Sequence, residues 1–139
     1  MKLDTEHLGR CIQTLESSLE RLGASEPESI DYEIYRNATV KGFELVLEAT
    51  GKLLRKALQP YFAGSRAVDE LYFKALFRHA AKHGLLNVEE VERWFAYRDN
   101  RNTTAHDYGE RFAEETLRLL PDFIADAKRL QGRIDRVDA

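Results

Sequence analysis

The segment from Arg101 to Tyr108 (Arg-Asn-Thr-Thr-Ala-His-Asp-Tyr) holds the side chains of this chain that are best suited to chemistry. His106 follows Arg101 by five residues, and Tyr108 follows it by seven. Arginine is a permanent cation whose planar fork matches phosphate oxygens. Histidine takes up and releases a proton near neutral pH. An arginine and a histidine that meet at one phosphate can therefore cleave a phosphodiester bond without a metal ion.

The composition indicates one globular domain spanning residues 1–139. The 139 residues are 43% hydrophobic, which is enough for a core, and carry a net charge of -3. A general nucleic-acid coat protein would be basic, whereas a small basic site is compatible with this charge. The single cysteine, Cys11, excludes an intrachain disulfide and a cysteine-cluster metal site. No signal peptide or membrane span is evident in the sequence, so we expect a cytoplasmic protein.

Hydrophobic residues recur with helical spacing in five segments, and no segment has the alternation of a strand. We predict an all-α, up-and-down antiparallel bundle of four to five helices. In the fourth segment, Asn87 to Glu90 reads as a capping box, and in the last segment Pro121 predicts a kink. The segments cover approximately residues 3–22, 31–58, 68–80, 87 onward, and 110 into the tail.

The hydrophobic stripe of the fourth helix leads directly to two arginines. If that helix continues, the positions after Val91 and Trp94 on the same face are Arg98 and Arg101, and the next include Tyr108. A buried, unpaired guanidinium is very costly. This face must therefore open onto a groove, meet carboxylates such as Asp99 or Glu44, or face a partner.

His106 and Arg101 do not share a face of an unbroken helix, because five residues correspond to a rotation of about 140°. They converge on one phosphate only if the backbone breaks near Thr103 and Thr104, or if a second copy of the chain supplies one of them. The simpler alternative treats the arginines as surface residues at a helix end and Tyr108 as a packing residue. Spacing alone leaves these alternatives open.

The motif and its surroundings resemble the HEPN family, in particular the HepT toxin branch, whose members are encoded beside minimal nucleotidyltransferases. The motif of that branch is Arg, four residues, His, one residue, Tyr, and Arg101, His106 and Tyr108 fill it; Asn102 matches the polar residue that commonly follows the arginine. The likeness extends to a first helix with residues 15–22, a long second helix with residues 43–48, and the pair Leu120-Pro121. It covers nearly the whole chain, although only the motif is specific.

The resemblance implies a HEPN-like helical fold and a homodimeric, metal-independent endoribonuclease without a cofactor. His106 would be the general acid/base, and Arg101 would hold the phosphate and stabilise the charge that develops on it. Asn102 and Arg98 would support phosphate and RNA binding. The RNA would be tRNA or mRNA, and DNA would not be cut because it lacks the 2′-hydroxyl.

The motif tyrosine, Tyr108 in this chain, has a separate role in the family that the chain resembles. The resemblance implies that a partner nucleotidyltransferase, the antitoxin of a type VII-like toxin–antitoxin pair, transfers AMP to Tyr108 and silences the nuclease. The tethered nucleotide would block the RNA site by its bulk and charge. The alternative is a non-catalytic substrate-binding or docking subunit of the nucleotidyltransferase, in which the arginines bind a nucleotide or the partner protein.

Three other groups of residues offer weaker signals. His79 and His83 have a zinc-binding spacing but no evident third ligand, so we expect no metal site. The acidic residues near Glu90 are expected to form a solvated face with a capping role. The second helix is basic between Arg36 and Lys56. That character is compatible with an RNA backbone track, but a solvated face is the simpler interpretation.

Overall fold

The computed structural model describes residues 3–104 and 110–137, and within these it leaves the side chains of residues 102–104, 110–113 and 137 undescribed. The described chain is all-α, as predicted. It contains α1 (Glu6–Gly23), α2 (Ile30–Leu58), the 3-10 turn η1 (Gln59–Tyr61), α3 (Ser65–Asp69), α4 (Phe73–Lys82), α5 (Val88–Thr104) and α6 (Glu110–Val137). The expected third helix is thus divided into α3 and α4. Pro121 lies inside α6.

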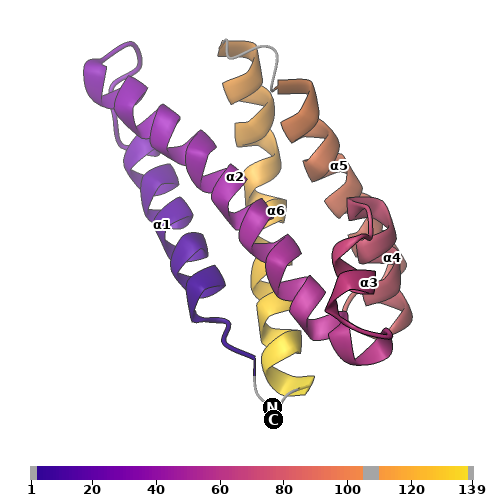
Figure 1. The fold of residues 1–139 in the computed structure, drawn as a ribbon. Helices are drawn as coiled ribbons and strands as arrows, with labels where there is room; N and C mark the ends of the chain where they lie inside the picture. Colours follow the sequence, from indigo (N-terminus) through magenta and orange to yellow (C-terminus); the bar gives the residue numbers. More distant parts are fainter. Residues whose placement is uncertain (1–2, 105–109, 138–139) are drawn as a thin grey trace.

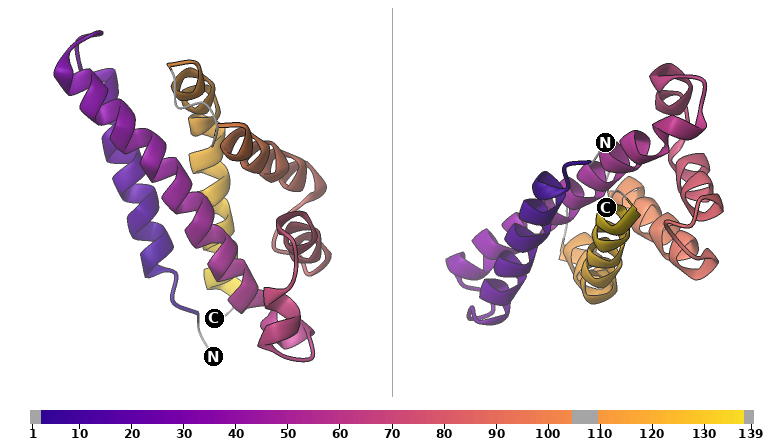
Figure 2. Two further views of the ribbon diagram at one scale, coloured as in Figure 1. Left: turned by 45° about the horizontal axis from the view of Figure 1, so that its top comes forward. Right: turned by 90° about the horizontal axis from the view of Figure 1, so that it is seen from below.

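The long helices form a bundle in which α6 contacts three others (Figure 1). α1 and α2 make an antiparallel hairpin, and α6 packs against both of them and against α5. α3 and α4 lie at the end of α2, and the views in Figure 2 agree with this arrangement. The two ends of the described chain meet, because the Thr5 hydroxyl donates a hydrogen bond of 2.8 Å to the Asp135 carboxylate.

Local sequence signals explain where the second and fifth helices begin. The Ser29 hydroxyl accepts a hydrogen bond from the Tyr32 amide (3.0 Å) and caps α2. The predicted capping box of α5 is confirmed: the Asn87 side chain accepts from the Glu90 amide (2.8 Å), and the Glu90 carboxylate accepts from the Asn87 amide (3.1 Å). The end of α2 is followed by Pro60, whose missing N–H does not support further α-helix.

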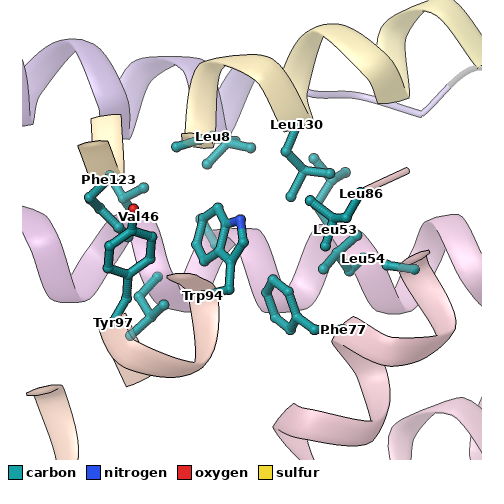
Figure 3. Packing of buried hydrophobic residues seen from close by; sticks show 14 of the residues in the cluster. Leu8, Val46, Leu53, Leu54, Phe77, Leu86, Trp94, Tyr97, Phe123 and Leu130 are labelled. Atoms are coloured by element: carbon teal, nitrogen blue, oxygen red, sulfur yellow. The ribbon is translucent and has the colours of Figure 1, made fainter. Parts of the chain in front are cut away.

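An aromatic cluster forms the centre of the core (Figure 3). Trp94 of α5 is fully buried, and its ring centroid lies 5.2 Å from Phe77 of α4, 5.4 Å from Tyr97 and 5.5 Å from Phe123 of α6. These rings therefore connect α4, α5 and α6 around one tryptophan. Burial of such large side chains is the main favourable contribution to the free energy of folding.

Ion pairs between buried carboxylates and partly exposed arginines join α5 to α6 beside these rings. The Asp126 carboxylate, which has no exposed surface, accepts hydrogen bonds from Arg93 (2.9 Å), Tyr97 (2.6 Å) and Arg129 (2.6 Å). Glu90 accepts a bond of 2.6 Å from Arg133. Glu90 is only 1% exposed, so the expectation of a solvated face was wrong for this residue.

Candidate functional site: a basic pocket between α2, α4 and α5

The described part of the arginine face opens onto a pocket. Val91 and Trp94 of α5 are buried, whereas Arg98 and Arg101 on the same face are half-buried and line a pocket of about 430 Å³. The sequence predicted that this face would open onto a groove, meet carboxylates or face a partner, and the structure shows a groove. The lining residues come from α2 (Leu47, Glu48, Gly51, Lys52, Arg55), from the α3–α4 connection and the start of α4 (Leu71, Tyr72, Phe73), and from α5 (Arg98, Arg101).

Positive charge is concentrated in this pocket. Its described lining includes three arginines and one lysine but only one carboxylate, that of Glu48, although the whole chain has a net charge of -3. Such local concentration attracts anions even on an acidic protein. The pocket is therefore suited to a phosphate-bearing ligand.

Arg98 is held where it faces both an aromatic ring and another cation. Its guanidinium carbon lies 5.1 Å from the centroid of the Phe73 ring, a cation–π geometry. Burial and, in addition, the charge of Arg101 lower the pKa of Arg98 from its ordinary value. Arginine nevertheless stays protonated at neutral pH. Two guanidinium groups that repel each other in this way are stabilised when an anion binds between them.

Glu48 and Lys52 form an ion pair across one turn of α2, with 3.0 Å between the Lys52 Nζ and the Glu48 Oε1. The hydrogen bond and charge of Lys52, with smaller contributions from Lys41 and then Arg101, outweigh burial and hold the pKa of Glu48 below its ordinary value. Both side chains are well exposed, so solvent screens the pair. Lys52 can exchange this weak partner for a ligand phosphate at little cost.

Arg55 has a structural task at the base of the pocket. Its guanidinium donates to the Val68 carbonyl oxygen (2.7 Å) near the end of α3 and to the Leu71 carbonyl oxygen (2.9 Å) within the α3–α4 connection. These bonds hold the connection against α2. Tyr72, the next residue, has an extended backbone before α4 and is 85% exposed.

A second hollow continues the basic surface along α2. It has a volume of about 380 Å³, shares Lys52 and Arg55 with the first pocket, and adds Lys56. Part of the basic character of α2 is therefore gathered along two adjoining hollows. The solvated-face interpretation holds for Lys52, which is exposed, but it does not describe Arg55, whose guanidinium bonds to two backbone carbonyl oxygens.

The structure places only some of the predicted site residues. Arg98 and Arg101 are brought together in the pocket. Asn102 belongs to α5, but its side chain is not described, and His106 and Tyr108 lie outside the described residues. The carboxylate found beside Arg101 in the pocket is Glu48, whereas the proposed candidate Glu44 pairs with Lys41 of its own helix (3.8 Å).

Sequence reasoning missed Glu48 and Tyr72 as pocket residues. The only sequence signal for this region was the run of basic residues in the second helix. Tyr72 is one of the tyrosines whose rings could stack on bases, but its spacing within the expected third helix favoured packing, whereas the structure leaves it 85% exposed. The pairs Tyr61–His83 and Phe62–His79 are ring contacts with centroids 3.7 and 5.0 Å apart. Within the described residues no cluster of potential metal ligands is found.

The chain belongs to a known family, which is described as nucleotidyltransferase substrate binding protein like and matches residues 3–136. It is 26% identical over 133 residues to a Haemophilus influenzae protein named Probable ribonuclease HepT, with 93% of this chain and 90% of that protein covered. None of the helices in the described ranges is long and apolar enough to cross a membrane.

Two solved structures share the fold. A protein from Thermus thermophilus superposes with a TM-score of 0.72 at 27% identity, covering 91% of this chain and 98% of that one. HI0074 from Haemophilus influenzae, described as the fold of a substrate binding domain of a nucleotidyltransferase, superposes with a TM-score of 0.80 at 23% identity. The superposition with HI0074 covers 94% of this chain and 98% of that one. The bundle is therefore a known helical fold.

Proposed function

We propose that this chain is the toxin of a type VII-like toxin–antitoxin pair, a homodimeric, metal-independent endoribonuclease that cuts tRNA or mRNA in the cytoplasm. AMP transfer to Tyr108 from a partner nucleotidyltransferase silences it. The observation that carries the proposal is the position of Arg101 in a pocket whose described lining has more cations than carboxylates. Arg101 precedes His106 by five residues and Tyr108 by seven. The similarity to a protein named Probable ribonuclease HepT supports it.

The cleavage step needs no cofactor. The His106 imidazole removes the proton of a ribose 2′-hydroxyl, and the 2′-oxygen forms a bond to the adjacent phosphorus. The bond from phosphorus to the 5′-oxygen breaks, and that oxygen takes a proton from water or from His106 of a second copy. Arg101 stabilises the charge on the phosphate oxygens, while Arg98 and Asn102 orient the phosphate. The products are a 2′,3′-cyclic phosphate and a 5′-hydroxyl.

The test is cleavage of tRNA and mRNA by the isolated chain in the presence of a chelator. We expect His106→Ala to lower the rate by about 10²–10⁴-fold and Arg101→Ala by about 10²–10³-fold. Arg118→Ala, an exposed arginine on α6, is the matched control and should cut normally. Unchanged cleavage by either site variant, or an absolute need for a metal ion, contradicts the proposed mechanism.

The second candidate is a docking subunit that binds a nucleotide or the nucleotidyltransferase without cutting RNA. The description of the family favours it. Intact-mass measurement after co-expression with the nucleotidyltransferase separates the two. AMP on the peptide that contains Tyr108, together with cleavage by the unmodified chain, supports the toxin. A stable complex with no AMP and no cleavage supports the docking subunit.

A further inference from the structure

Two features of the basic pocket have no role in the cleavage step. One is Gly51, which lies in the interior of α2 and lines the pocket. The other is Tyr72, a large aromatic side chain with 85% of its surface exposed on the same pocket. Each is unfavourable for the free chain, because interior glycine weakens a helix and an exposed aromatic side chain loses the benefit of burial.

Comparison with Gly42 shows that packing does not explain Gly51. A Cβ at Gly42 would approach the Leu15 side chain to 3.2 Å, so the close packing of α1 on α2 favours glycine there. A Cβ at Gly51 would meet no described atom within 4 Å beyond the backbone of its own helix. The space that a side chain at Gly51 would enter is the pocket itself. A bound ligand that approaches the helix backbone would explain the glycine.

Tyr72 is held in place by the backbone around it. Arg55 binds the carbonyl oxygens of Val68 and Leu71 immediately before it, and Phe73 immediately after it stacks on Phe77 with 4.4 Å between ring centroids. The backbone at Tyr72 is therefore fixed on both sides while its ring remains in solvent. An exposed aromatic ring on a fixed backbone next to cations is suited to stacking on a nucleic-acid base.

We propose that this pocket binds one nucleotide unit, with its base stacked on Tyr72, its phosphate between Lys52 and Arg98, and its sugar over Gly51. The volume of about 430 Å³ lies within the range of about 300–1,000 Å³ typical of small-ligand sites. The proposal rests on the proposed function, because an RNA-binding or nucleotide-binding role supplies the nucleotide. The source of this nucleotide is either an RNA strand that continues to Arg101 or a free mononucleotide.

The experiment measures binding rather than cleavage, so that failure of the subsite and failure of the nuclease are distinguishable. The probes are a short single-stranded RNA with 2′-O-methyl ribose throughout, which 2′-hydroxyl attack cannot cut, and AMP. We expect Tyr72→Ala to weaken binding of at least one probe by about fivefold or more. Tyr61→Ala, an exposed tyrosine outside this pocket, should leave the affinity unchanged.

Variants at two further positions test the proposed phosphate contact of Lys52 and the proposed place of the sugar over Gly51. For the RNA probe, Lys52→Gln should lower the slope of log affinity against log salt by about 0.7. Lys128→Gln, which removes a similarly ion-paired lysine on α6, should not change the slope. Gly51→Leu should block binding, and Gly51→Ala, which keeps the helix intact, should weaken it less.

The outcomes are distinct for the two sources of the nucleotide. Loss of RNA binding in Tyr72→Ala assigns the subsite to a strand, and loss of AMP binding alone assigns it to a free nucleotide. Unchanged affinity for both probes in folded Tyr72→Ala and Gly51→Leu, judged by circular dichroism and melting temperature, overturns the proposal. Cleavage by the wild-type chain, measured separately, tests the proposed function whichever probe binds.

Discussion

Helix α5 takes part in two charged clusters that differ in how their charge is balanced. Toward α6, the arginines bond to the buried carboxylates of Asp126 and Glu90. Toward α2, Arg98 and Arg101 line a pocket with further cations and one exposed carboxylate, that of Glu48. The first cluster, which we call the α5–α6 ion-pair network, pairs its buried carboxylates with arginines of the fold. The second has more cations than carboxylates among its described lining residues.

The two clusters on α5 are therefore expected to differ in what they affect. A buried carboxylate is strongly destabilising when its charged partner is removed, so the α5–α6 network holds the helices together. The pocket places like charges near each other, which costs free energy in the unliganded chain. Substitutions in the network should therefore change stability, and substitutions in the pocket should change ligand affinity.

The largest stability change is expected for Asp126→Ala. The substitution removes the acceptor of Arg93, Tyr97 and Arg129 and leaves the buried Tyr97 hydroxyl without it. Because both arginines are partly exposed and can turn to water, we expect a loss of about 2–4 kcal/mol in the free energy of unfolding. Urea denaturation measures it, with Asp122→Ala on the exposed side of α6 as the control. A loss below about 1 kcal/mol would contradict a structural role.

The same carboxylate predicts the response to acid. Burial alone raises the pKa of Asp126, but hydrogen bonds from Arg93, Tyr97 and Arg129 outweigh it and hold the pKa below its ordinary value. The stabilisation is therefore complete above the unfolded pKa of about 3.9 and is lost as the pH falls through the lower folded value.

This pH dependence is measured as the difference in unfolding free energy between the wild type and Asp126→Asn. It should be constant from neutral pH down to about 4 and should shrink at lower pH. Thermal or urea denaturation at several pH values provides the measurement. A difference that instead shrinks between pH 8 and 5 would mean that another group controls it.

Glu48→Gln is expected to act on affinity and hardly on stability. The substitution removes the one carboxylate among the described lining residues of the pocket, so affinity for single-stranded RNA should rise by about threefold to tenfold at low salt. Because the Glu48–Lys52 pair is exposed, stability should change by less than about 0.5 kcal/mol. Glu16→Gln, which breaks the exposed pair with Lys128, should leave affinity unchanged. Equal effects of the two variants on affinity would show that the overall charge of the chain, and not the pocket, attracts RNA.

The smallest effect is a gain in stability for Gly51→Ala. Alanine is favoured over glycine in a helix interior by roughly 0.5–1 kcal/mol, and the added methyl group meets no described packing atom. The free energy of unfolding should therefore rise by about that amount in urea denaturation. Gly42→Ala is the contrast, since its methyl group would press on Leu15 and remove the gain. A loss of stability in Gly51→Ala would mean that the pocket is closed in solution.

Much of the fold was predictable because its signals are local. Helical spacing of hydrophobic residues indicated an all-α bundle, and the Asn87–Glu90 capping box was readable from a few neighbouring residues. The arginine face was also predictable, because two guanidinium groups in place of hydrophobic residues require a groove, a counter-charge or a partner. The structure contains the groove, lined by Arg98 and Arg101.

The sequence by itself therefore determined most of the helices, the capping box of α5 and which face of α5 carries the two arginines, since these depend on residues within a turn or two of one another. Only the tertiary structure decided which residues face Arg101. The pocket joins segments of α2, the α3–α4 connection and α5 that are far apart in the chain. It also decided that Glu90 is buried, because its partner Arg133 comes from a distant helix. Long-range packing sets burial and charge balance, and no local pattern encodes which distant side chain supplies the partner.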